Sequence, residues 1–223
     1  MDTICPWTYL AKRRLDAALS LARFHPDIIS FSVEFSPVII RPYQLYPDIS
    51  PEGQDKYAWY LLTKFDDSQE RMKLYTTLMS TYGSESGISF SFHGVIANTL
   101  EAHRVIQQVQ IDFGAEMAGR LVDALYKAYF EEEKHPSSVE TLVEACERAG
   151  MDRDEAERMV VGNGKREDGL RETKRMVLEQ KMQGVDSVPT VRIEGLRRDV
   201  TLVGAKSVDE YVRALVLVAK ESK

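Results

Sequence analysis

The segment Asp2–Leu10, which reads DTICPWTYL, decides how this sequence folds. After it, apolar residues recur at helical spacing as far as Ala22, so a helix is predicted from Pro6 onward. Proline is favoured in the first turn of a helix because its missing N–H would have no partner there. Cys5 is thereby placed at the N-cap, where free backbone N–H groups and the helix dipole favour a thiolate. The sequence therefore predicts a nucleophilic cysteine at the start of a helix.

One Cys-Pro pair also fits other interpretations. A secreted protein could hold Cys5 in a disulfide, and a cytosolic protein could bury it as a small apolar residue. The chain has two cysteines, Cys5 and Cys146, so no framework of disulfides is expected. Cys146 falls on the inward face of a predicted helix and is interpreted as a structural thiol. We expect a reducing, cytoplasmic setting.

Composition restricts the partners that this chain can have. It has 223 residues, enough for one large domain or for a core domain with an insertion. Hydrophobic residues make up 43% and charged residues 29%, and the net charge is −6. Without an excess of positive charge, nucleic acid is not expected as a partner. No apolar run approaches the length of a membrane span, so no membrane partner is expected either. A homodimer is left open.

The periodicity of the chain changes several times. Ile29–Phe35 alternates apolar and polar side chains, which predicts a strand. A proline-rich loop follows, and residues from Gln54 to about Gln183 are helical by pattern. Within this region Asn98–Glu101 resembles a capping box. Thr190–Gly204 predicts a hairpin and Ser207–Ala219 a closing amphipathic helix. The predicted order is helix, strand, long helical insertion, hairpin and helix.

Four segments in this order closely resemble the DsbA-like thioredoxin family, in its FrnE-like branch. They are Asp2–Leu15, Pro42–Gly53, Asn98–Arg104 and Val188–Val191. The resemblance implies an α/β, thioredoxin-like fold with a large all-helical insertion. The thioredoxin-like domain would comprise residues 1–47 and 184–223, and the insertion residues 48–183. It further implies a thiol-dependent oxidoreductase with Cys5 as the catalytic residue, no bound cofactor and no metal.

The resemblance also implies which residues surround the thiol. Val188-Pro189 resembles the family's cis-proline loop, which lies against the active-site cysteine and binds extended substrate backbone. Asn98 and His103 resemble residues of the insertion that face the cleft and contact the substrate. For His103, a hydrogen-bonded histidine of the core is an equally good interpretation. The expected partner is a thiol or disulfide, carried by a protein or by a small molecule.

The sequence departs from the family at Thr8. The family's usual motif is Cys-Pro-Trp-Cys, whereas Cys5, Pro6 and Trp7 are followed here by Thr8. In dithiol exchange the second cysteine resolves the mixed disulfide by attacking it from within the same protein, which threonine cannot do. We therefore predict a monothiol variant that forms mixed disulfides, with glutathione as an expected cosubstrate, and that is a poor dithiol oxidase.

Two other functions remain open. The related kappa-class glutathione transferase and 2-hydroxychromene-2-carboxylate isomerase group carries a serine near the position of Cys5 and acts on small metabolites. Its glutathione-binding Gly-Ser-Asp segment would fall near Gly204–Lys206, where this chain has no carboxylate, which weakens that alternative. The other alternative is a binding module without catalysis, which would hold an extended peptide beside Pro189.

The family's first strand is the second departure. Members begin with a strand that delivers the cysteine to the top of the sheet, but only Met1–Ile4 precede Cys5. These are too few for a strand of about five or six residues. We therefore expect either a true start upstream of Met1 or an open, partly unpaired sheet. In the latter case a gap would separate the Phe31–Phe35 strand from the Thr190–Gly195 hairpin.

Overall fold

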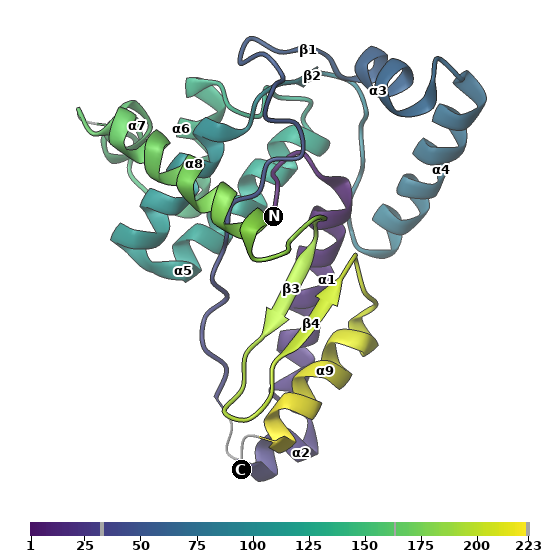
Figure 1. Cartoon of the computed structure of the whole chain (residues 1–223), viewed down its shortest axis with the longest axis vertical. Helices are drawn as coiled ribbons and strands as arrows, with labels where there is room; N and C mark the ends of the chain where they lie inside the picture. The colour runs from purple at the N-terminus through teal and green to yellow at the C-terminus, as the bar shows by residue number, and fades with distance from the viewer. Residues whose placement is uncertain (32–33, 163, 222–223) are drawn as a thin grey trace.

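The computed structural model describes residues 1–31, 34–162 and 164–221. Figure 1 shows two parts: helices α1, α2 and α9 with the β3–β4 hairpin below, and helices α3 to α8 above them. The fold is the predicted thioredoxin-like α/β fold with a helical insertion. The helices and strands, in chain order, are α1 (Pro6–Ala22), α2 (Pro26–Phe31), β1 (Gln54–Asp55), α3 (Lys56–Phe65), α4 (Gln69–Glu85), β2 (Val95–Ile96), α5 (Leu100–Phe130), α6 (Val139–Ala149), α7 (Arg153–Val161), α8 (Arg166–Met182), β3 (Thr190–Ile193), β4 (Val200–Val203) and α9 (Val208–Glu221).

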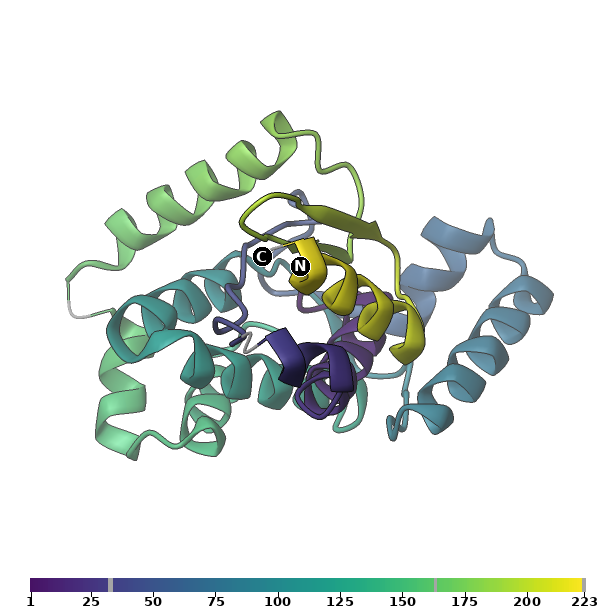
Figure 2. The ribbon, with the colours of Figure 1, turned by 90° about the horizontal axis from the view of Figure 1, so that it is seen from below.

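Helix α1 begins as the sequence predicts, with Cys5 at the N-cap and Pro6 in the first turn. One face of the helix packs on α9, where Leu15 and Ala18 of α1 join Tyr211 and Leu215 in one buried cluster. Burial of a large apolar side chain contributes about 1.5–3 kcal/mol, so this contact anchors the two ends of the chain to each other. Figure 2 shows α1 beside α9, with α3 and α4 on one side of the pair and α5 to α7 on the other.

The strand predicted at Ile29–Phe35 is wrong where the structure describes it. Residues Pro26–Phe31 form helix α2, and the following described residues 34–53 contain no strand. Pro26 and Asp27 are typical of a first helical turn, and they outweigh the short alternation after them. Packing adds to this, because Ile28 is buried against Val216 of α9 and the neighbouring apolar residues of that helix. Residues 32 and 33 lie outside the described residues.

The strands form two small antiparallel sheets, one of β1 with β2 and one of β3 with β4. In the hairpin Thr190 lies opposite Val203 and Ile193 opposite Val200, as the predicted hairpin requires. Within residues 1–31, 34–162 and 164–221, β3 pairs with β4 alone, so its other edge has no neighbouring strand. This edge is unpaired, as the prediction of an open sheet requires, but the predicted gap between two strands is not seen, because Pro26–Phe31 is helical and the described residues 34–53 contain no strand. Helices α1 and α9 cover the apolar side chains of the hairpin.

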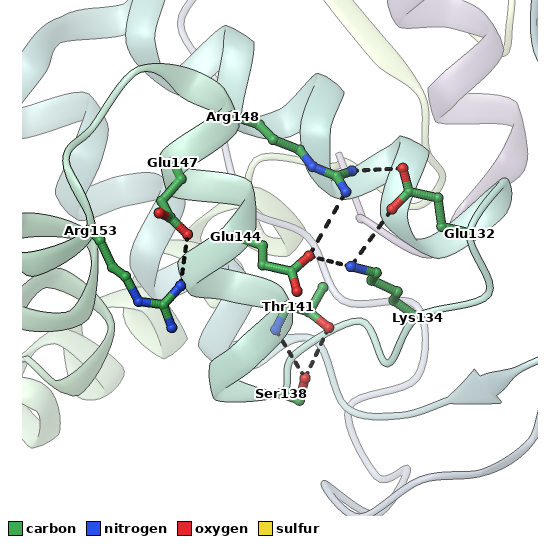
Figure 3. A network of polar contacts seen from close by, with 8 residues as sticks. All are labelled: Glu132, Lys134, Ser138, Thr141, Glu144, Glu147, Arg148 and Arg153. Carbon is green, nitrogen blue, oxygen red and sulfur yellow. Dashed lines mark hydrogen bonds and ion pairs between the residues drawn. The ribbon is translucent and has the colours of Figure 1, made fainter.

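The helical insertion is organised around α5, which packs on α6 and α8. Gly114, with φ 86° and ψ 169°, bends α5 where a side chain would be strained. Polar contacts join the end of α5 to α6: Arg148 pairs with Glu132, and Lys134 pairs with Glu144 (Figure 3). None of the described helices is long and apolar enough to cross a membrane. The domain limits at residues 47 and 184 stay a prediction.

Candidate active site

Cys5 joins two segments that lie far apart in the sequence. At the N-cap of α1 its carbonyl oxygen accepts hydrogen bonds from the Thr8 and Tyr9 N–H groups, at 3.0 and 3.2 Å. Its Sγ donates to the carbonyl oxygen of Val188 at 3.6 Å. The Val188–Pro189 peptide bond is cis, and β3 begins at the next residue. The predicted proximity of this loop to the thiol is therefore seen in the structure.

The surroundings of Cys5 favour the thiol over the thiolate. The residue is only 3% exposed, and this burial raises the pKa of Cys5 above its ordinary value. Hydrogen bonding from the Thr8 side chain and the amides of Thr8 and Trp7 lowers the pKa, whereas the nearby Asp2 raises it. The sequence led us to expect a thiolate stabilised by the helix N-terminus. The structure corrects this, because the cost of burying a charge exceeds the effect of the helix start.

A buried acidic residue and a buried histidine lie beneath the active-site segment. Asp2 and His103 are both completely buried, with Asp2 Oδ1 3.4 Å from His103 Nε2. The other Asp2 oxygen, Oδ2, accepts from the Leu45 N–H at 2.7 Å, which fixes the loop after Arg41. Among the described residues, neither ring nitrogen of His103 has a hydrogen-bond partner. His103 is therefore buried beside Asp2, with no surface to offer a substrate.

Asn98 has a structural position in this arrangement. Its Nδ2 donates to the Pro47 carbonyl at 2.6 Å, and its Oδ1 accepts from Gln44 Nε2 at 3.0 Å. The same oxygen accepts from the Leu100 N–H at 2.9 Å, so Asn98 also helps to begin α5. The predicted capping box is only partly right, because the Glu101 side chain does not reach back but bonds with Arg104. Asn98 thus holds the loop that carries Tyr46 against α5.

The thiol opens into a cavity of about 320 Å³. Several elements line it: the start of α1, the loop before β1, helices α3 and α4, and the loop before β3. Five of the eleven described lining residues are aromatic: Trp7, Tyr46, Tyr60, Phe65 and Tyr75. Lys64 is the single charged side chain among the described residues that line it. The cavity therefore offers apolar surface, one cation and one thiol.

Sequence reasoning missed the wall of this cavity. The tyrosines of α3 and α4 pack on each other, as core residues do: the Tyr60 and Tyr75 rings are 6.1 Å apart. Their second role, facing Cys5 across the cavity, depends on where the two helices dock. Nothing in the spacing of these tyrosines distinguishes a cavity wall from core packing. Pro189 and Asn98 are not among the described lining residues, whereas Val188 is.

A second cavity, of about 410 Å³, lies on another side of α1. It is lined by Tyr9 and Arg13 of α1 and by residues of α5 and α6, including Asp123 and Arg148. Cys5 is not among the described residues around it. Although this cavity is larger, no cysteine is among its described lining residues, so the cavity at Cys5 is the candidate active site.

Comparisons with known proteins agree with this geometry. Residues 1–216 match the model of the DSBA-like thioredoxin domain. A solved structure of a probable DsbA oxidoreductase from Streptomyces coelicolor is similar over 100% of this chain and 88% of its own, with 22% identity and a TM-score of 0.77. A candidate protein disulfide isomerase from Nitrosomonas europaea is similar over 100% of this chain and 96% of its own, with 11% identity and a TM-score of 0.63. No significant match is found among curated protein sequences. Since the family model covers nearly the whole sequence, the chain belongs to the DSBA-like thioredoxin domain family.

Proposed function

We propose that this chain is a thiol–disulfide oxidoreductase that works with a single cysteine, Cys5. The observation that carries the proposal is the position of the Cys5 Sγ, at the start of α1, 3.6 Å from the Val188 carbonyl and at the wall of a cavity. Family membership supports the reaction type. The monothiol character rests on Thr8, which stands where the family's second cysteine is expected.

The proposed reaction has two exchanges. The Cys5 thiolate attacks one sulfur of a disulfide; a Cys5–substrate disulfide forms, the substrate's own S–S bond breaks, and the released thiolate takes up a proton. A second, external thiolate then attacks the substrate sulfur of the mixed disulfide. A disulfide between the external thiol and the substrate forms, the Cys5–substrate S–S bond breaks, and Cys5 is released as a thiolate. Glutathione is the proposed cosubstrate for this step, because Thr8 supplies no sulfur. A cytoplasmic setting is proposed for the same reason, since reduced thiols are abundant there.

The other residues around Cys5 have proposed supporting roles. Pro6 begins α1 and so fixes the position of the nucleophile. Trp7 lines the cavity and packs on Tyr82, with ring centroids 5.8 Å apart. The Val188 carbonyl holds the thiol, and the loop at Pro189 is a proposed contact for the substrate. Asn98 and His103 would position the site from behind rather than touch the substrate.

Mass measurement of the intact protein tests the proposal. We expect incubation with oxidised glutathione to add one glutathione, and the adduct to disappear when a reduced thiol is added. Cys146→Ala should behave as the wild type, because Cys146 is fully buried and its pKa is raised to about 12. Cys5→Ser should form no adduct. A protein that binds disulfides but never forms a covalent adduct at Cys5 would be a binding module, and the proposal would be wrong.

A further inference from the structure

The residues that line the Cys5 cavity indicate a class of substrate, which family membership alone does not. We propose that the substrate of Cys5 is a small aromatic thiol or disulfide that bears a negative charge, rather than a disulfide of a folded protein. This inference rests on the proposed reaction at Cys5. Three properties of the cavity support it: its aromatic lining, its enclosure of the thiol, and one unpaired cation.

The aromatic lining is a continuous, braced surface. Tyr60 and Phe65 come from α3 and both pack on Tyr75 of α4, with ring centroids 6.1 and 5.2 Å apart. Tyr46, on the loop opposite, packs edge to face on Trp59 at 4.6 Å. Rings held in this way have little freedom to move aside, and they bind other rings by stacking and edge contacts. The surface is therefore suited to a planar apolar group.

The enclosure of the thiol argues for a small ligand. Cys5 is 3% exposed, so a substrate sulfur reaches it only through the cavity. About 320 Å³ lies at the lower end of the volume range of small-molecule sites. A polypeptide entering it would bury backbone N–H and C=O groups against aromatic rings, where unpaired polar groups are costly. A compact molecule without a backbone avoids that cost.

Lys64 supplies the charge preference. It is the single charged side chain among the described lining residues, and its Nζ lies 4.5 Å from the Tyr46 ring centroid and 6.0 Å from that of Trp59. Over residues 1–31, 34–162 and 164–221, no ion pair involves Lys64. An anionic substituent such as a carboxylate would pair with this ammonium group while the ring lies among the tyrosines.

A set of four symmetrical disulfides tests the inference. Dithiodibenzoate is aromatic and anionic, dithiodianiline aromatic and neutral, dithiodipropionate aliphatic and anionic, and cystamine aliphatic and cationic. For each disulfide, the rate of adduct formation at Cys5 is measured by mass and divided by the rate at which the same disulfide reacts with N-acetylcysteine. This rate ratio removes differences in the intrinsic reactivity of the four disulfides. We expect the rate ratio for dithiodibenzoate to exceed that for dithiodipropionate by about ten-fold or more, because the free energy gained by burying an aromatic ring corresponds to at least a change of that size. Cystamine should give the lowest ratio.

Two lysine variants separate charge from shape. Lys64→Gln should lower the ratio for dithiodibenzoate by up to about five-fold and leave that for dithiodianiline unchanged. Lys73→Gln is the matched control, because Lys73 is an exposed lysine of the neighbouring helix α4 outside the described lining, and it should change neither ratio. Equal rate ratios for all four disulfides, or an unchanged ratio for dithiodibenzoate in Lys64→Gln, would overturn this inference about the substrate but not the proposed reaction at Cys5. Absence of any adduct at Cys5 would instead overturn the proposed reaction.

Discussion

The Cys5 Sγ donates a hydrogen bond to the Val188 carbonyl oxygen, so an acceptor lies beside the nucleophile. An acceptor beside a thiol stabilises its protonated form, because the lone pairs of the oxygen repel a thiolate. Burial acts in the same direction and raises the pKa of Cys5. The resting site therefore holds a protected thiol, and the helix start must help it to ionise when a substrate is present.

The first prediction concerns Asp2, whose charge is one of the causes that raise the pKa of Cys5. Asp2→Asn removes that charge but keeps an oxygen that can accept from the Leu45 N–H. We expect the pKa of Cys5 to fall. The measurement is the rate of Cys5 alkylation against pH, in a Cys146→Ala background so that one thiol reacts.

Wild-type protein is the reference for this titration. Its alkylation midpoint should lie above the ordinary cysteine value, because burial is the largest influence on Cys5. A midpoint at or below that value would show that the helix N-terminus outweighs burial. An unchanged or higher midpoint in Asp2→Asn would show that the Asp2 charge does not reach the thiol.

The second prediction restores the missing resolving thiol. Thr8 lies in the first turn of α1, and its N–H donates to the Cys5 carbonyl at 3.0 Å. Thr8→Cys should therefore create dithiol oxidase activity, measured as multiple turnovers of disulfide exchange without an added monothiol. Thr8→Ser, which also removes the threonine methyl but adds no sulfur, should remain inactive in this assay. Wild-type protein that already turns over without added thiol would contradict the monothiol mechanism.

Local signals in the sequence predicted the parts of the site that depend on short segments. Pro6 places Cys5 at a helix N-cap, and the segment around Pro189 predicted the loop beside it. The protonation state of the Cys5 thiol could not be predicted, because it depends on burial by elements that are distant in the sequence. Alternation at Ile29–Phe35 predicted a strand, yet the first-turn signal of Pro26 and contacts with α9 decide the helix seen there. The aromatic wall likewise depends on how α3 and α4 dock.

The third prediction tests the ion pairs between α5 and α6. Glu144 pairs with both Lys134 and Arg148, and Glu132 pairs with the same two cations (Figure 3). A network of ion pairs contributes more to stability than an isolated surface pair does. Glu144→Gln should therefore lower the free energy of unfolding by about 1 kcal/mol. The loss, measured by urea denaturation, should shrink at 1 M salt, where charges are screened.

Glu147→Gln is the matched control on the same helix. Among the residues that the structure describes, Glu147 pairs with Arg153 alone, at 3.3 Å, and the Arg153 side chain is largely exposed. We expect its removal to change the free energy of unfolding by less than about 0.5 kcal/mol. Equal losses in the two variants would show that the shared position of Glu144 adds nothing to stability.

The last prediction concerns Lys56, which joins α3 to the end of α5. The residue is completely buried, and its Nζ donates to the Tyr129 carbonyl oxygen at 2.9 Å. Burial lowers the pKa of Lys56 from 10.5 to about 8, and Glu133 offsets only part of that change. The folded protein thus prefers the neutral amine, and folding at pH 7 carries the cost of burying the charged form.

The sign of the pH dependence follows from the two pKa values. Between about pH 8 and pH 10.5 the unfolded chain keeps the Lys56 proton while the folded protein has lost it. The unfolded state then binds more protons, so stability rises with pH across this window. Relative to Lys56→Met, which cannot titrate, wild-type protein should gain roughly 3 kcal/mol from pH 7.5 to pH 10.5. Urea denaturation of both proteins at several pH values measures the difference. Lys73→Met, which removes an exposed lysine, should run parallel to wild type. A flat difference for Lys56→Met would show that burial does not lower the pKa of Lys56.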